Sequence, residues 1–307
     1  MTVAVYVAIY AGLFIFLAGC LRRILAYTRT PLHLRWELYP LPHEHPYRAA
    51  YGGSYFETQQ WWRQPQAADR GGEWRVMIEE IFFLKSLRQC NRLLWLPSFL
   101  FHCGLYLAIV AGCCAALSGL PVGPGLAALS GAMALAATVT LLAAAILIAV
   151  GASLLLLRRI TDPALKNSTH AGDIFNLILF IATSSLLIGG YLLRAPGTAS
   201  LGELTRAMVH FDRGIKIGPA FGAGLILASM LLAYIPFTHM AHFIAKYFTW
   251  HAVRWDDRRN EAGSEIEKKV TALLGGKPTW SAPHVSADGR RTWAEIATAN
   301  PTEEARK

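Results

Sequence analysis

The stretch Leu93-Leu94-Trp95-Leu96-Pro97-Ser98-Phe99-Leu100-Phe101-His102-Cys103-Gly104-Leu105-Tyr106 decides the fold of this chain. It opens an apolar run over residues 93–118, which is long enough to cross the ~30 Å hydrocarbon core of a bilayer as a helix. A histidine lies inside this run, and ionisable groups within membrane segments are costly and usually functional. The stretch therefore predicts a membrane helix that carries part of a site.

Four other apolar stretches accompany it, over residues 3–20, 126–157, 174–193 and 219–248. The chain has 307 residues, of which 54% are hydrophobic and 16% are charged, a composition typical of a multi-pass membrane protein. Because a spanning helix takes ~20 residues, we expect an all-α integral membrane protein with five transmembrane helices. The expected segments are helix one (1–20), a loop (21–92), helices two to five (93–248) and a tail (249–307).

The distribution of lysine and arginine predicts the orientation of these helices. Of the 29 such residues, 25 fall in the segments 21–92 and 158–173 and in the tail after Ala245. Positive residues mark the cytoplasmic side, so the N-terminus is expected outside and the C-terminus in the cytoplasm. The net charge of +9 mostly reflects this asymmetry, and no nucleic-acid partner is inferred from it.

The first apolar run ends in Leu17-Ala18-Gly19-Cys20, which is similar to a lipoprotein cleavage box. A secretory signal begins with positive charges, but residues 1–10 carry none, and Arg22 and Arg23 follow the run instead. An uncleaved first helix is the favoured interpretation.

The loop over residues 21–92 is too aromatic to be a disordered linker. Its last part, 73–92, is predicted to be helical. The aromatic residues are either a collar at the membrane interface or a docking surface for a soluble subunit, and both roles are compatible. The polar tail contains a predicted short helix over 260–274 and is expected to be mobile or to lie against a partner.

His102 and a second histidine, His242 in the fifth apolar run, are predicted to lie at the same depth. His102 follows the interfacial Trp95 by seven residues, or ~10 Å of helix. His242 precedes Trp250 by eight residues, or ~12 Å from the same face. One neutral imidazole from each of two helices is the simplest way to hold a haem iron.

Other interpretations of these histidines stay open at this point. Each imidazole could be a polar residue satisfied by a neighbouring carbonyl, and His239, three residues before His242, could be the ligand or a second-shell donor. A small-molecule transporter would use such histidines as a proton relay, although no inverted repeat is evident. A non-redox membrane anchor would use them for packing.

Three sequence patterns resemble the respiratory nitrate reductase gamma subunit family, a group of membrane cytochromes b. Residues 100–106 (LFHCGLY) resemble its second-helix haem motif, and residues 236–242 (PFTHMAH) resemble its fifth-helix motif. Residues 159–163 (RITDP) resemble a turn of the family on the cytoplasmic side. The resemblance extends over most of residues 20–260 and aligns His102 and His242 with axial ligands of the haem iron.

A closer similarity links the loop and tail to the cytochrome b subunits of the Tmc and Dsr membrane complexes. It is carried by Trp36-Glu37-Leu38-Tyr39-Pro40 and by residues 234–236 (YIP) and 255–257 (WDD). Those subunits accompany a heterodisulfide-reductase-like iron–sulfur protein. The resemblance thus implies a bacterial inner-membrane protein with a cytoplasmic iron–sulfur partner, either heterodisulfide-reductase-like or ferredoxin-like.

The chain departs from the family pattern at two positions. The family binds two haems, and its second ligand pair corresponds to Gly112 and Gly224 here. We therefore predict one haem b, bound by His102 and His242 on the cytoplasmic side. Glycine at both places is expected to let these two helices approach each other closely.

The resemblance implies electron transfer between menaquinone or ubiquinone and the cytoplasmic partner. Lys85, Arg88 and Arg92 are candidate contacts for haem propionates, although their plainer role is anchoring at the membrane surface. A quinone pocket near His210 and Asp212 on the outer side would lie too far from the single haem. A pocket near that haem, with His239 as proton acceptor, is the preferred hypothesis.

Overall fold

The computed structural model describes residues 1–29, 44–64, 69–120, 127–251, 255, 260–281, 285 and 287–300. The described residues form helices and no strand. The motif at residues 36–40 and residues 256 and 257 lie outside the described residues.

Among the described residues, five helices are long and apolar enough to cross a membrane, in agreement with the predicted number of spans. They are α1 (Thr2–Thr28), α5 (Arg92–Gly119), α6 (Ala127–Thr161), α8 (Ala171–Leu192) and the segment Pro219–Phe237, which begins with α10 (Pro219–Tyr234).

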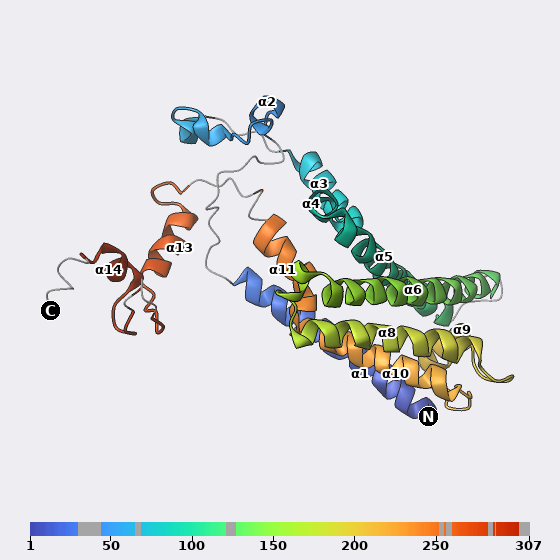
Figure 1. Ribbon diagram of the computed structural model, residues 1–307. Helices are drawn as coiled ribbons and strands as arrows, with labels where there is room; N and C mark the ends of the chain where they lie inside the picture. Colours follow the sequence, from blue (N-terminus) through green and yellow to red (C-terminus); the bar gives the residue numbers. More distant parts are fainter. Residues whose placement is uncertain are drawn as a thin grey trace. The chain divides into compact units, whose positions relative to one another are not determined.

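Shorter helices precede α5, join the spans or follow the fifth span (Figure 1). They are α2 (Pro46–Ala49), η1 (Tyr55–Glu57), η2 (Trp61–Arg63), α3 (Arg70–Phe83), α4 (Lys85–Cys90), α7 (Pro163–Lys166), α9 (Leu201–Val209), η4 (Ile235–Phe237), η5 (His239–Ala241), α11 (His242–Lys246), η6 (Tyr247–His251), α13 (Glu265–Leu274) and α14 (Trp293–Thr298).

The described chain forms two compact units, the first of which, Met1–Arg22 with Trp74–His242, is the helical bundle. Its most extensive contact joins α5 to α6, and α8 packs against both α6 and α10 (Figure 1). Glycines permit the α5–α6 contact: a Cβ on Gly104 would lie 2.8 Å from the backbone nitrogen of Ile148, and one on Gly151 would lie 2.6 Å from that of Phe101. Such small residues let helix backbones approach closely in membranes.

The helix α1 likewise approaches α10 closely at glycines. A Cβ on Gly12 would lie 2.7 Å from the carbonyl oxygen of Ser229, and one on Gly19 would lie 2.6 Å from the Cβ of Pro236. At the opposite end of the contact, the hydroxyl group of Tyr6 donates to the carbonyl oxygen of Asp212 at 2.7 Å. The first span is therefore an integral part of the bundle.

The short amphipathic helix α9 folds back onto the ends of α5 and α6. It begins with a capping box in which the Ser200 hydroxyl and the Glu203 carboxylate satisfy backbone N–H groups. The Arg206 guanidinium donates to the Ser130 hydroxyl at 2.9 Å. The opposite, apolar side of α9 is buried in the bundle, so α9 closes this end of the helices.

The fifth span differs from the continuous helix that the apolar run 219–248 suggests. The α-helix α10 ends at Tyr234, short 3₁₀ turns follow, and Thr238 between them has an extended backbone. Pro236 lacks an N–H group and its ring clashes with the preceding helical turn, which explains the break. The depth estimate for His242, which assumed an unbroken helix, therefore rests on a wrong local geometry.

The predicted helix over 73–92 is likewise divided in two. α3 ends at Phe83 and α4 begins at Lys85, because Leu84 between them adopts a left-handed conformation with φ of 49°. The buried carboxylate of Glu80 accepts hydrogen bonds from the backbone and hydroxyl of Ser86, which fixes this turn.

The second unit consists of Arg23–Glu73 and Phe243–Lys307. The rings of Tyr27 and Phe248 stack within it at a centroid distance of 5.4 Å. The predicted tail helix over 260–274 is shorter in the structure, because Ser264 caps α13 and starts it at Glu265.

Candidate functional site

His102 and His242 come from separate elements and face each other. His102 lies in the third turn of α5, and His242 is the first residue of α11, after the break in the fifth span. Their ring centroids are 6.2 Å apart with an interplanar angle of 69°. The two imidazoles thus meet, as the predicted equal depth requires.

A backbone carbonyl orients each imidazole. The Nδ1 atom of His102 is 2.7 Å from the carbonyl oxygen of Ser98, and that of His242 is 3.3 Å from the carbonyl oxygen of His239. A carbonyl oxygen only accepts, so each Nδ1–H donates to it, and a neutral imidazole with that proton has its lone pair on Nε2. Metal-binding histidines are commonly held in this way, with the second nitrogen bonded to a carbonyl.

The spacing of the rings fits a shared metal. An imidazole nitrogen lies about 2.0 Å from a metal that it binds, so two rings on opposite sides of one metal have centroids about 6 Å apart. The observed 6.2 Å agrees with this distance. Two imidazoles at this spacing are the protein ligands that a haem iron takes, since the porphyrin supplies the others.

Aromatic side chains enclose the His102 side of the pair. The Phe101 ring meets His102 edge-on at 5.7 Å and also packs edge-on against Phe180 of α8 at 4.8 Å. Tyr106, one turn beyond His102, lies 6.5 Å from it. These rings make the surroundings of the imidazole largely apolar, which suits a hydrophobic cofactor.

His239 does not share a helix face with His242, although its spacing of three residues before His242 suggests that it would. It belongs to the turn η5, and its Nε2 atom lies 3.4 Å from the Asp173 carboxylate near the start of α8. The same carboxylate accepts from the Arg159 guanidinium at 3.4 Å and from the backbone of His170 at 3.0 Å. Whereas the His242 ring faces His102, the His239 side chain joins an Arg–Asp–His cluster, and 64% of it is exposed.

The sequence analysis missed Asp173 as a partner of His239. A carboxylate in the first turn of a helix is an ordinary capping residue, so it carried no signal of a site. Asp173 fills that role toward His170, but it also ties α6 and η5 to α8. Only the tertiary arrangement shows this second role.

The basic candidates Lys85, Arg88 and Arg92 lie before or at the start of α5. The ammonium group of Lys85 pairs with Glu79, and the guanidinium of Arg88 lies over the Trp95 ring at 5.2 Å. Arg92 is the first residue of α5. A propionate would have to compete with the Glu79 and Trp95 contacts, so this role remains a prediction.

Gly112 and Gly224 do not bring α5 and α10 together. A Cβ on Gly224 would lie 3.0 Å from the backbone nitrogen of Leu187, so this glycine serves the contact of α10 with α8. A Cβ on Gly112 would meet no atom within 4 Å. The expected close approach of these two helices at the paired glycines is therefore wrong.

His210 and Asp212 lie at the other end of the bundle. His210 ends α9, and the Asp212 carboxylate accepts from the backbone of Gly214 at 2.8 Å. Next to them a packed apolar core fills the bundle, made of Leu187, Leu201, Leu204, Ala207, Met208, Phe221 and Leu225 together with their neighbours.

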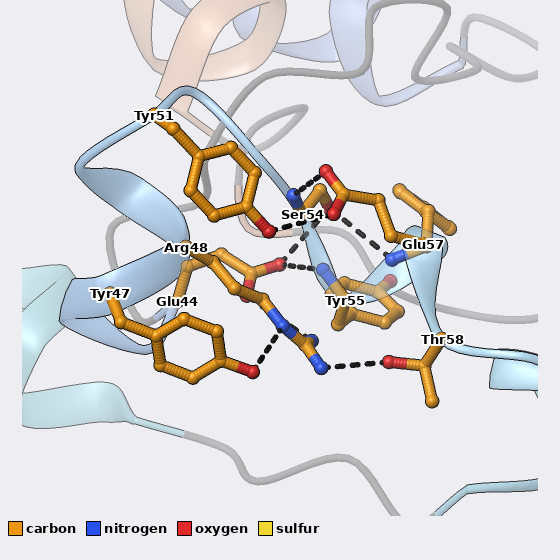
Figure 2. Close-up of polar contacts among 9 residues, drawn as sticks. Glu44, Tyr47, Arg48, Tyr51, Ser54, Tyr55, Glu57 and Thr58 are labelled. Carbon is orange, nitrogen blue, oxygen red and sulfur yellow. Dashed lines mark hydrogen bonds and ion pairs between the residues drawn. The ribbon is translucent and has the colours of Figure 1, made fainter.

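Residues 44–64 of the predicted docking loop contain a compact local network of hydrogen bonds, shown in Figure 2. The Glu44 carboxylate accepts from the hydroxyl of Ser54 and the backbone of Tyr55. Glu57 accepts from the backbone of Ser54 and from the hydroxyl of Tyr51, and that hydrogen bond raises the pKa of the Tyr51 phenol. This local network gives the loop a defined conformation, as its aromatic composition predicts.

Comparison with known families gives one finding. Residues 86–256, more than half of the chain, match the model of a family described as nitrate reductase gamma subunit. The match contains α5, α6, α8 and α10 together with His102 and His242. It concerns the family as a whole, so the similarity to Tmc and Dsr subunits remains a prediction. No curated protein matches the chain.

Proposed function

Because this chain belongs to the nitrate reductase gamma subunit family, whose members are haem b-binding electron-transfer subunits of respiratory complexes, we propose that it carries electrons through one haem b. His102 and His242 would bind this haem. The observation that carries the proposal is the pair itself: two imidazoles, one from α5 and one from α11, with ring centroids 6.2 Å apart and each with Nδ1 hydrogen-bonded to a carbonyl.

Ligation by two histidines leaves a haem iron no open position, so the group supplies electron transfer and does not bind a substrate. The protein's part is to hold the two rings in place. The carbonyls of Ser98 and His239 keep each Nδ1 protonated and thereby present each Nε2 as the donor atom. A fixed site of this kind needs little rearrangement during electron transfer.

The contrast between the two ends of the bundle supports the proposal of a single haem. The positions of the second ligand pair hold glycines, one of which, Gly224, packs against the backbone of α8. The apolar side of α9 adds side chains to the core at the same end of the helices. A second haem would have to displace these residues.

Quinone and an iron–sulfur subunit are the proposed electron partners. With the N-terminus outside, the haem lies near the cytoplasmic surface, close to a partner docked on residues 21–92 and the tail. Menaquinone or ubiquinone would bind near the same haem, and His239, which is held by Asp173, would accept a proton from the quinol. Such a pocket would make turnover electroneutral.

The experiment is a spectrum of the purified full-length protein. A reduced-minus-oxidised spectrum should show the alpha band of haem b, and a pyridine haemochrome assay should give one haem per chain. Two haems would leave the cytochrome function standing but contradict the one-haem proposal. A preparation without haem would exclude electron transfer of this kind.

The role of His239 has a separate test. His239→Ala should keep the haem and reduce quinol oxidation, with His210→Ala at the far end of the bundle as matched control. Full quinol oxidation in His239→Ala with haem retained would refute a proton acceptor at this position.

A further inference from the structure

The hairpin formed by α3 and α4 is a built structure that neither haem binding nor electron transfer requires. Its tip is the sequence Ile81-Phe82-Phe83-Leu84, with Leu84 in the left-handed region at φ of 49°. That conformation costs a residue with a side chain about 1–2 kcal/mol, so other contacts must hold the turn. The Glu80 carboxylate does so by accepting from the backbone and hydroxyl of Ser86.

Two aromatic side chains of α5 fasten this tip. The Trp95 indole donates to the carbonyl oxygen of Phe83 at 2.8 Å, and the Tyr106 hydroxyl donates to the carbonyl oxygen of Ile81 at 2.5 Å. The Phe82 ring packs against that of Tyr106 at 5.4 Å. The tip thus lies along α5, with Phe83 bonded to Trp95 in its first turn and Ile81 bonded to Tyr106 further along the helix.

The depth of the tip follows from its position along α5. Tyr106 lies fourteen residues after Arg92, about 21 Å along the helix axis. Its side chain leans toward the helix N-terminus, so its hydroxyl lies over the preceding turn, which is the turn of His102. α5 is long and apolar enough to cross a membrane, so we expect the carbonyl of Ile81 at a depth within the hydrocarbon core and that of Phe83, bonded to Trp95, nearer the interface.

Three carbonyl groups at the tip meet the condition that hydrocarbon imposes on a backbone. A helix end leaves its last carbonyl groups without partners, and within a bilayer each of these must be satisfied by the protein. Here Ile81 and Phe83 are satisfied by the α5 side chains, and the carbonyl of Leu84 accepts from the backbone of Arg88 at 2.9 Å. A tip in water would need no such contacts.

The side chains of the tip also suit lipid. Phe82 and Phe83 are 50% and 53% exposed, and Ile81 is 42% exposed. Charged residues flank the tip, and each has a partner: Glu80 directly before it is buried and accepts from Ser86, and Lys85 directly after it pairs with Glu79, as does Arg75. Exposed Leu93 and Leu96 of α5 extend the same kind of apolar surface along the span.

We propose that the α3–α4 hairpin is inserted in the membrane leaflet that contains His102, with Ile81, Phe82, Phe83 and Leu84 in contact with lipid acyl chains. The last part of the 21–92 segment is then a re-entrant element and not a soluble loop. This proposal does not depend on haem or on the electron partners. The depth of the tip argues against a water-soluble protein as its contact partner. Contact with another membrane subunit instead of lipid would be a contrary outcome of the test.

The test introduces p-benzoyl-L-phenylalanine at Phe82 or Phe83 in the full-length protein and illuminates intact membranes. Leu96, on the exposed surface of α5, is the lipid-facing reference, and Trp280, an equally exposed aromatic residue in the polar tail, is the matched control. Mass spectrometry should find phospholipid adducts at Phe82 and Phe83 as at Leu96, and none at Trp280. Adducts with a protein at both tip positions, or no adduct where Leu96 gives one, would overturn the proposal.

A second measurement uses the unsubstituted protein, so it does not depend on the folding of a variant. Hydroxyl-radical labelling of the chain in lipid nanodiscs should oxidise Trp280 and leave Phe82 and Phe83 protected. Oxidation of Phe82 and Phe83 as strong as in the exposed tail would show that water reaches the tip and would overturn the proposal.

Discussion

The end of the bundle that holds His102 and His242 differs from the end that holds α9. At the first, the histidine end, the fifth span breaks into short turns, and polar groups such as Asp173 and His239 contact one another. At the second, the α9 end, the same span is a regular helix whose Phe221 is almost completely buried. Irregular backbone in a membrane is tolerated where it lies within protein or lines a site, so the difference supports the proposal that the site lies at the histidine end.

The strongest test of this comparison is removal of an axial ligand. His102→Ala or His242→Ala should abolish haem binding completely, because one imidazole is left to hold the iron. The pyridine haemochrome assay measures this loss, and His210→Ala at the α9 end is the control that should keep its haem. Full haem content in both ligand variants would show that the site lies elsewhere.

The next effect concerns packing at the α9 end. Phe221→Ala should lower the free energy of unfolding by about 3–5 kcal/mol, because it leaves a cavity among buried side chains. Denaturation by SDS in mixed micelles gives this value, with the exposed Leu193→Ala as control. The haem content of the folded fraction should not change. A loss of haem without a loss of stability would mean that the α9 end contributes to the cofactor site.

The two glycines give a matched pair of smaller effects. Gly224→Ala forces a Cβ against the backbone of α8 and should cost about 1–3 kcal/mol. Gly112→Ala meets open space and should stabilise the helix by up to about 1 kcal/mol. The same denaturation assay compares the variants. Equal effects at both positions would contradict the packing of α10 on α8 at Gly224.

The smallest effect is expected at the polar cluster of the histidine end. Asp173→Asn weakens the contacts with Arg159 and His239, and exposed or partly exposed ion pairs contribute about 1 kcal/mol or less. Haem stoichiometry should therefore remain that of the unsubstituted protein in the haemochrome assay. Loss of haem in this variant would assign Asp173 a direct role in holding the cofactor site together.

The spans and the pairing of the histidines were predictable because both depend on local features. An apolar run of sufficient length must become a helix in a bilayer, and its interfacial tryptophan sets the approximate depth of nearby residues. The prediction for His102 needed only a regular α5. The predicted proximity of His242 to His102 is correct, although the prediction assumed a continuous helix and Pro236 interrupts that helix.

Other features could not be found in this way, since they depend on contacts between distant residues. The return of α9, the pairing of Asp173 with His239 and the packing of Gly224 against α8 join residues from separate elements of the fold. The turn at Leu84 is equally hidden, because leucine favours a continuous helix and only Glu80 together with Trp95 and Tyr106 holds the chain otherwise.

The sequence by itself thus determined the five membrane spans, the family and the two histidines that meet. The spans depend on the length of apolar runs, which the thickness of the bilayer constrains directly. The family and the histidines depend on residue types at the fixed spacing of a motif. Only the tertiary structure decided what surrounds the histidines, what fills the opposite end of the bundle and how the segment before α5 turns. In a membrane these features depend on close packing and on the need to satisfy every buried polar group. Both requirements are met by contacts between different helices, which the sequence of one helix does not show.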